Sequence, residues 1–425
     1  MTEDFLHFIW KYGLFERSGM ITDTGESVQI ITLGEHNTNA GPDFLNSRIR
    51  IGQTTWAGNV EIHLYSTDWT YHRHYADKAY DNVILHVVHR YNGSVTRTGG
   101  EVIPSVELRF DPALFENYRL LQQHQGWLPC QNKLKKVDRL IFDLWLNSLV
   151  IERLQQKTQY ITGLLDQLKN SWEETFYILL ARTFGFGLNA TPFEMLTRSV
   201  PWRYLLRHRN HIFQLEALLM GQAGFLDEDR LYADYYLKLR QEYLHLKHKY
   251  NLRPVERHLW KFLRLRPMNF PTIRIAQFAA LLNKNDRLLS QVVDSPQLNG
   301  LHACFDVQAS PFWDSHYSFD SASPLRKKKL GNDAFNLIII NAVVPFLFLY
   351  GRMNGREDLK ERALDWLDLT PPEKNRITRR WSQYGIALNS AFSSQGLMQL
   401  TRSYCSCKRC LACSIGANII TSARD

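Results

Sequence analysis

Two acidic residues and a histidine have the types and spacing of a metal-dependent hydrolytic site. Asp43 follows Pro42 at the start of an alternating segment, and Glu61 and His63 lie in the next one. Side chains of a strand alternate between its two faces, so Glu61 and His63 share one face. The connection between the segments, residues 52–57, is short enough for a hairpin, which would bring Asp43 beside that face.

Two carboxylates on adjacent strands repel each other unless a cation joins them. Mg²⁺ suits such a pair, because it takes a few carboxylate oxygens and keeps several waters. One such water can attack a phosphodiester while the metal offsets the charge of the phosphate. We therefore expect Asp43 and Glu61 to hold Mg²⁺ or Mn²⁺, and His63 to position or deprotonate the attacking water.

Further polar residues flank these three and are additional active-site candidates. They are Glu35 and Asn37 before Asp43, His72 and His74 after the Glu-x-His segment, and His86 in the next strand.

Each of these candidates has a plainer interpretation. Two histidines two residues apart, flanked by aspartates, can bind a metal. The same segment also fits a polar loop that Trp69 anchors over the site. His86 interrupts the apolar segment 83–88, where a hydrogen-bonded core histidine is the alternative to a site residue.

The pattern along the chain predicts an α+β fold. A helix is expected over residues 4–15, with strands over 28–33, 44–51, 60–65, 83–88 and 102–110. From residue 137 the pattern is almost wholly helical, with helices expected over 202–220, 228–250, 271–282, 334–350, 358–367 and 372–384. We predict a mixed sheet flanked by helices in residues 1–115 and a helical domain with a cysteine cluster in residues 116–425.

The cysteines near the C-terminus form a second motif. Cys405, Cys407, Cys410 and Cys413 lie within nine residues and can close around Zn²⁺ or a [4Fe-4S] cluster. Four ligands from so short a span would strain a tetrahedral zinc site, so Cys130 is an alternative to Cys407. Either metal would be structural, and free thiols in a tail are the other interpretation.

Charge favours a polyanionic partner. The 425 residues carry a formal net charge of +9, and the pI is about 9.1. Cationic side chains alternate with aromatic ones in the helical part, as in proteins that contact phosphates and stack on bases. The candidates for nucleic-acid contact are Arg203, Arg207, Arg257, Lys261, Arg264, Arg266 and Arg274.

No membrane segment is expected. The longest apolar run, residues 337–350, contains Asn341 and Pro345 and is shorter than the roughly 20 residues of a bilayer span. We expect a buried, kinked helix there. The acidic start of the chain and the crowding of cysteines at one end favour a cytoplasmic protein over a secreted one.

The first motif resembles the PD-(D/E)XK nuclease superfamily. In that superfamily an aspartate opens one strand and Glu-x-Lys lies on the next, as Pro42-Asp43 and Glu61-x-His63 do here. The resemblance implies a nuclease fold, and the departure is His63 in place of lysine. Some members add an acidic residue on the first helix, where Glu3 is the candidate.

The whole chain also resembles an uncharacterised bacterial family of the Bacteroidetes, known only as a domain of unknown function. Gly41-Pro42-Asp43-Phe44, residues 58–63, 83–88, 221–224 and 266–271 and the C-terminal cysteines carry this resemblance.

These features together predict a metal-dependent nuclease that hydrolyses phosphodiester bonds of DNA, favoured over RNA. The alternative is a non-catalytic nucleic-acid-binding or scaffold protein on a degenerate nuclease fold. A third hypothesis is a metal hydrolase that uses His63, His72 and His74 on another substrate.

Overall fold

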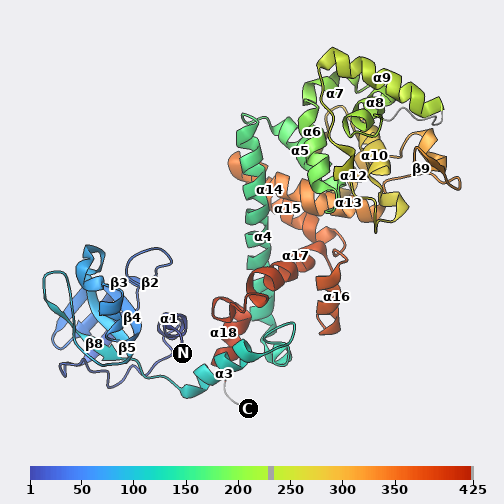
Figure 1. Cartoon of the computed structure of the whole chain (residues 1–425). Coiled ribbons are helices and arrows are strands. Elements are labelled where there is room, and N and C mark those ends of the chain that lie inside the picture. The colour runs from blue at the N-terminus through green and yellow to red at the C-terminus, as the bar shows by residue number, and fades with distance from the viewer. Residues whose placement is uncertain (228–233, 423–425) are drawn as a thin grey trace. The chain divides into compact units, whose positions relative to one another are not determined.

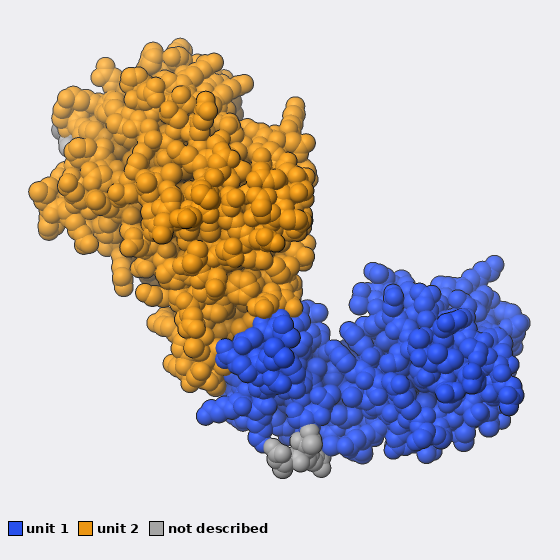
Figure 2. Space-filling view, turned by 180° about the vertical axis from the view of Figure 1, so that it is seen from behind, with its two compact units in different colours: residues 1–145, 400–425 blue, residues 146–399 orange. Residues whose placement is uncertain are grey.

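The chain divides into two units in the computed structural model, which describes residues 1–227 and 234–422 (Figure 1). The first unit comprises Met1–Trp145 and Leu400–Asp425, and the second comprises Leu146–Gln399 (Figure 2). The division therefore differs from the boundary predicted at residue 115, because the C-terminal segment packs with the N-terminal residues. The second unit is an insertion in the sequence of the first.

A mixed sheet forms the core of the first unit. Its order is β1-β3-β4-β5-β8, with β2 also paired to β3. The pairs β1–β3 and β3–β4 are antiparallel, whereas β4–β5 and β5–β8 are parallel. The strands are β1 (Val28–Thr32), β2 (Glu35–His36), β3 (Phe44–Ile51), β4 (Thr54–Tyr65), β5 (Val83–Arg90) and β8 (Ser105–Glu107).

Two local features set the register between β3 and β4. The strands join through a two-residue turn at Gly52, whose φ of +57° suits the tight hairpins that match strand twist. Phe44 pairs with Val60 but Ser47 pairs with Gly58, so β3 holds one extra residue. Asn46, with φ of +59°, lies in this bulge. A bulge bends its strand and changes where the neighbouring side chains point, and this one lies three residues after Asp43.

Helix α1 (Glu3–Lys11) packs against β4. Its buried face carries Phe5, Phe8, Ile9 and Trp10, which follow the spacing of an amphipathic helix. The Trp10 indole donates to the carbonyl of Leu33, just after β1. This bond ties the helix to the segment after β1, while its packing on β4 places it beside the strand that carries Glu61.

The rest of the first unit joins the sheet to the C-terminal segment. Its elements are α2 (Asp68–Tyr71), β6 (Val95–Thr96), β7 (Val102–Ile103), α3 (Pro112–Gln123) and α18 (Ser414–Thr421). Asn117 on α3 donates to the carbonyl of Ile420 at 3.2 Å, and Gln122 donates to the carbonyl of Lys408 at 2.9 Å. These bonds join residues that are 303 and 286 positions apart in the sequence.

The second unit is helical around one large apolar core. Helix α4 (Arg139–Gln167) contains the point of division between the units. The following helices are α5 (Trp172–Phe184), α6 (Ala190–Ser199), α7 (Trp202–His208), α8 (Ile212–Gln222), α9 (Asp234–Tyr250), α10 (Pro271–Lys284), α11 (Leu288–Asp294), α12 (Leu298–Phe305), α13 (Asn332–Ile338), α14 (Val344–Met353), α15 (Glu357–Leu369), α16 (Arg376–Gln383) and α17 (Ala391–Gln399). The short strands β9 (His316–Ser318) and β10 (Ser321–Ala322) pair with each other. The start predicted for α9, residues 228–233, lies outside the described residues.

The predicted α+β class is confirmed: an N-terminal mixed sheet precedes a large helical part. The apolar run forms α13 and α14, joined by a π-helical turn over Ile339–Val343. Within the described part of the chain, helix Asn332–Met353 is long and apolar enough to cross a membrane. However, 78% of its most apolar window is buried in protein, as in a core helix.

Candidate metal centre

Asp43 lies directly before β3, and hydrogen bonds from the loop between β2 and β3 hold it there. Asn37 donates its side-chain amide to the carbonyl of Pro42 at 3.0 Å, and its backbone N–H donates to the carbonyl of Asp43 at 2.8 Å. Asn37 thus holds the two carbonyl groups that precede and follow the Cα atom of Asp43. Asn37, one of the predicted active-site candidates, therefore contacts the backbone at Asp43.

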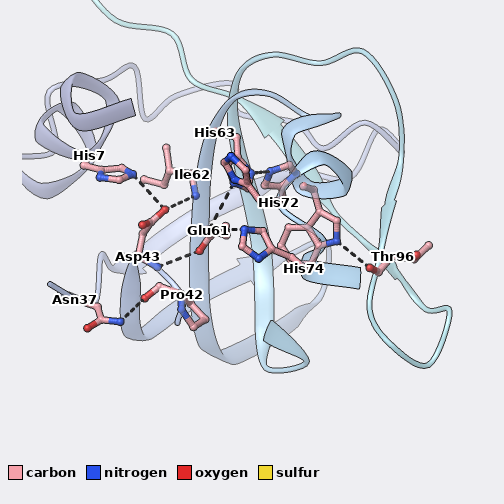
Figure 3. Close-up of polar contacts among 12 residues, drawn as sticks. His7, Asn37, Pro42, Asp43, Glu61, Ile62, His63, His72, His74 and Thr96 are labelled. Carbon is pink, nitrogen blue, oxygen red and sulfur yellow. Dashed lines mark hydrogen bonds and ion pairs between the residues drawn. The ribbon is translucent and has the colours of Figure 1, made fainter. Parts of the chain in front are cut away.

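The two carboxylates are interlocked through the backbone (Figure 3). The Asp43 N–H donates to Oε2 of Glu61 at 3.1 Å, and the Ile62 N–H donates to Oδ2 of Asp43 at 2.9 Å. The Glu61 carboxylate therefore accepts from the backbone of Asp43, and the Asp43 carboxylate accepts from the backbone next to Glu61. The sequence expectation that Asp43 and Glu61 converge agrees with this geometry.

Burial makes this carboxylate pair costly without a cation. Glu61 is 5% exposed, and burial followed by the charge of Asp43 raises the pKa of Glu61 to about 9. Buried, like-charged carboxylates disfavour ionisation until a positive charge joins them. The donor set, two carboxylates side by side, therefore fits a divalent ion.

Helix α1 adds two residues to the site. His7 Nε2 lies 3.2 Å from Oδ2 of Asp43. Burial lowers the pKa of His7, but the contact with Asp43 and its charge outweigh burial, so the pKa is raised. Burial also raises the pKa of Glu3, which lies close enough to His72 and His7 for their charges to oppose that rise. Sequence reasoning did not select His7, because the helical pattern does not say which strand the helix covers.

On the other side of Glu61 lies a group of histidines. Nε2 of His63 and Nε2 of His74 lie 3.6 and 3.4 Å from Oε1 of Glu61. Nε2 of His63 is 3.1 Å from Nδ1 of His72, and Nδ1 of His63 is 2.8 Å from Nε2 of His86. Two of the predicted candidates, His63 and His74, thus meet Glu61 directly, and two more, His72 and His86, contact His63. Figure 3 shows His63, His72 and His74 beside Glu61.

The fold explains why these histidines meet. Glu61 pairs with His86 across the parallel β4–β5 ladder, so the two side chains lie on the same face of the sheet. The segment after β4 turns back over that face, where Trp69 is fully buried and its indole donates to the carbonyl of Thr96 at 3.0 Å. Trp69 thus anchors this segment, as in the polar-loop interpretation. The same segment also brings His72 and His74 close to His63, as in the metal-ligand interpretation.

These imidazoles are held uncharged. Burial, followed by the neighbouring histidines, lowers the pKa of His63 to about 2. Burial lowers the pKa of His86 to about 3 and that of His74 to about 4. An imidazole with a pKa near 2 is a weak acceptor for a water proton at neutral pH. His63 therefore fits a ligand or orienting role better than the predicted role of a base.

Glu35 is the candidate that the site does not use. It lies on β2 opposite Leu45 with its side chain exposed. No contact of the site described above involves it.

A profile of the family described as "Protein of unknown function (DUF2851)" matches residues 3–376. The chain belongs to this family. The matched range contains the whole carboxylate and histidine group and ends before the C-terminal cysteines. No curated protein and no solved structure matches the chain.

Four cysteines of the DUF2851 chain are buried. Cys130, Cys405, Cys410 and Cys413 are each 7–9% exposed, whereas Cys407 is exposed. Burial, followed by the charges of Cys130, Cys413 and Cys410, raises the pKa of Cys405. The other three buried cysteines thus lie close enough to Cys405 for their charges to act on its thiol, and Cys407 lies at the surface.

Backbone geometry supports this cysteine group. Cys413 precedes α18, and N–H groups of Ile415 and Gly416 donate to its sulfur. A Cβ on Gly416 would lie 2.2 Å from the carbonyl oxygen of Cys410, so only glycine fits there. N–H donors to a thiolate stabilise its charge, as outer-shell partners of metal ligands do.

The predicted cationic residues divide by exposure. Arg203, Arg207, Arg257, Lys261, Arg264 and Arg266 are exposed in the second unit. Arg274 is 8% exposed and donates to Gln277 at 2.8 Å and to Asn269 at 2.6 Å. Arg274 therefore lies inside the helical core, away from any surface that a nucleic acid could contact.

Proposed function

We propose that this DUF2851 protein is a metal-dependent nuclease that hydrolyses phosphodiester bonds, with DNA as the favoured substrate. The observation that carries the proposal is the interlocked pair of Asp43 and Glu61. A buried carboxylate with a pKa of about 9 beside a second carboxylate is a site suited to a divalent cation. The alternating strand pattern and the hairpin account for the pair independently of any resemblance.

Asp43 and Glu61 would hold Mg²⁺ or Mn²⁺, which when bound supplies a Lewis acid and a water of lowered pKa. The hydrogen bonds from Ile62 to Asp43 and from Asp43 to Glu61 keep the oxygen ligands oriented. In the reaction, water adds to phosphorus, the P–O bond to the leaving oxygen breaks, and the water proton ends on that oxygen or in solvent. His7, whose pKa is raised beside Asp43, can hold a proton at the edge of the site.

The order of elements supports a PD-(D/E)XK-like core. A helix precedes the sheet, the aspartate opens β3, the glutamate lies on β4 and an apolar strand, β5, follows in parallel. His63 stands where that superfamily has lysine. In this proposal its place as a neutral imidazole next to Glu61 makes it an orienting group rather than a fixed charge.

The exposed cations of the second unit would supply sequence-independent contacts to phosphates. Arg203, with its guanidinium 5.0 Å from the ring of Tyr204, and Arg207 lie on α7. Charges of this kind give affinity that falls as salt rises.

The four buried cysteines would hold Zn²⁺ or a [4Fe-4S] cluster with a structural role. Thiols with raised pKa values remain protonated without a metal, and a bound metal deprotonates them. The cysteine group would then link the segment after α3, which contains Cys130, to the C-terminal segment.

Cleavage of linear and circular DNA by the full chain tests the proposal. Wild-type protein should cut in Mg²⁺ or Mn²⁺ and stop when the ion is chelated, whereas Asp43→Ala and Glu61→Ala should lose at least about a hundredfold in rate. Glu26→Ala, which removes an exposed carboxylate of the same unit, is the matched control. Equal cleavage by all four proteins would refute the assignment. Salt-sensitive DNA binding with no metal-dependent cleavage would instead favour the non-catalytic scaffold.

A further inference from the structure

Three imidazoles beside Glu61 converge as metal ligands do. One nitrogen each of His63, His72 and His74 lies within 4.8 Å of the other two. Oε1 of Glu61 faces this group, while its Oε2 faces Asp43. Glu61 therefore presents one oxygen towards Asp43 and the other towards imidazole nitrogens (Figure 3).

The spacing matches the edges of a coordination polyhedron. With metal–ligand bonds of about 2.0–2.1 Å, adjacent ligand atoms lie about 3.3 Å apart in a tetrahedron and about 3 Å apart in an octahedron. The distances are 3.1 Å for His63–His72, 3.4 Å for His74–Glu61 and 3.6 Å for His63–Glu61. The three histidine nitrogens lie within 4.8 Å of one another, and Oε1 of Glu61 lies near two of them, those of His63 and His74.

An outer layer fixes the orientation of His63. Its Nδ1 meets Nε2 of His86, and Nδ1 of His86 lies 3.4 Å from the hydroxyl of Ser105. When Nδ1 of His63 donates to His86, the lone pair of Nε2 points at the group, as a ligating histidine requires. The fully buried His86 thus does for His63 what outer-shell partners do in metal proteins.

The ring nitrogen of His74 supplies a second observation that points to a bound ion. Its side chain is 8% exposed, and Nε2 is buried without a hydrogen bond. Tyr80 stacks on its ring at 3.8 Å between centroids and holds it in place. The polar atom nearest to it among those described above is Oε1 of Glu61, at 3.4 Å. A buried ring nitrogen that makes no hydrogen bond is costly, and a metal ion between it and Glu61 would remove that cost.

We propose that His63, His72 and His74, completed by Glu61, form a binding site for a first-row transition-metal ion of the zinc class. Imidazole nitrogen suits Zn²⁺, Fe²⁺ and Ni²⁺, whereas Mg²⁺ prefers oxygen. The side chain of His72 is exposed, so the ion and a water can reach the site from solvent at this residue. The site goes beyond the proposed nuclease function, because it is a second, nitrogen-rich position that shares only Glu61 with the first.

Zn²⁺ binding to the full-length, chelator-treated chain tests the site without any cleavage assay. Isothermal titration and metal analysis should show one Zn²⁺ fewer per chain in His72→Ala and His74→Ala than in wild type. Because His72 is exposed, its replacement tests ligation with little effect on folding. His258→Ala, which removes an exposed histidine of the second unit, is the matched control and should bind as wild type does.

The absorption spectrum of bound Co²⁺ distinguishes metal at the cysteines from metal at the histidines. Co²⁺ bound to thiolates gives intense sulfur charge-transfer bands, whereas Co²⁺ at imidazoles gives only weak d–d bands. His72→Ala should therefore remove the weak bands and Cys410→Ser the intense ones. Unchanged Zn²⁺ stoichiometry and Co²⁺ spectra in both histidine variants would overturn the proposal.

Asp43→Ala distinguishes failure of this site from failure of the proposed function. It should abolish Mg²⁺-dependent cleavage but keep the Zn²⁺ stoichiometry, since Asp43 is not among the four ligands. If Asp43→Ala loses cleavage while both histidine variants bind Zn²⁺ as wild type does, the transition-metal site alone is overturned.

Discussion

The substitution Glu61→Gln should stabilise the metal-free protein near neutral pH. The pKa of Glu61 is about 9 in the folded chain, against the ordinary value of 4.5. A raised carboxyl pKa contributes stability below about pH 4.5, and this stability is lost as pH rises towards 9, because the unfolded chain releases a proton that the folded chain keeps. Glutamine has nearly the same shape and no such proton.

The magnitude follows from the difference between the pKa values. At about pH 7.5 the unfolded glutamate lies about three pH units above its pKa, and at about 1.36 kcal/mol per unit the wild type loses about 4 kcal/mol. The glutamine oxygen can still accept the hydrogen bond from Asp43. We therefore expect the variant to be more stable than wild type by up to about 4 kcal/mol without metal.

A divalent ion should reverse this order. An ion that binds the folded state alone stabilises it by about 2.7 kcal/mol at one hundred times its dissociation constant. Wild type should gain this increment in Mn²⁺ and Glu61→Gln should gain little, since the variant lacks a charged ligand.

Hydrogen exchange measured by mass spectrometry on peptides covering β3 and β4 gives the local free energy of opening in each case. Glu26→Gln, at an exposed position, is the control. Parallel pH profiles of wild type and Glu61→Gln in chelator, with equal responses to Mn²⁺, would refute the reasoning.

Three further predictions address other parts of the chain. Cys410→Ser should lower the content of tightly bound zinc or iron and the melting temperature, whereas Cys407→Ser, at the exposed cysteine, should change neither; metal analysis and calorimetry compare them. Gly221→Ala should destabilise the second unit by about 1–3 kcal/mol, because its Cβ would lie 2.1 Å from the ring of Tyr243. Gly163→Ala, whose Cβ meets open space in α4, should be neutral or stabilising in the same urea titration. Arg207→Ala should weaken DNA binding and reduce its salt dependence by about one counterion, whereas Arg274→Gln should lower stability and leave the salt slope unchanged.

Local pattern was enough to predict the carboxylate pair. Alternation placed Glu61 and His63 on one face, and the short connection implied the hairpin that brings Asp43 beside them. The bulge at Asn46 was not predictable, because asparagine occupies left-handed conformations only occasionally and its position along a strand gives no stronger signal.

Long-range packing decided the rest of the site. His7 reaches Asp43 because α1 packs on β4, and His86 reaches His63 because β5 pairs with β4 in parallel. Neither pairing is encoded in hydrophobic period alone. Arg274 lies in the strongly apolar segment of α10, and that setting was the available sign that its charge is buried and hydrogen-bonded.

The insertion of the second unit into the sequence of the first has a consequence for biosynthesis. Helix α3 and Cys130 emerge from the ribosome some 270 residues before Cys405–Cys413, with which they pack. The helical unit, contiguous in sequence, can complete its core during this interval, since domains generally fold as units while the chain grows. The N-terminal unit must wait for its last segment, and until then the apolar face of α3 that receives α18 is open to chaperones and to proteolysis.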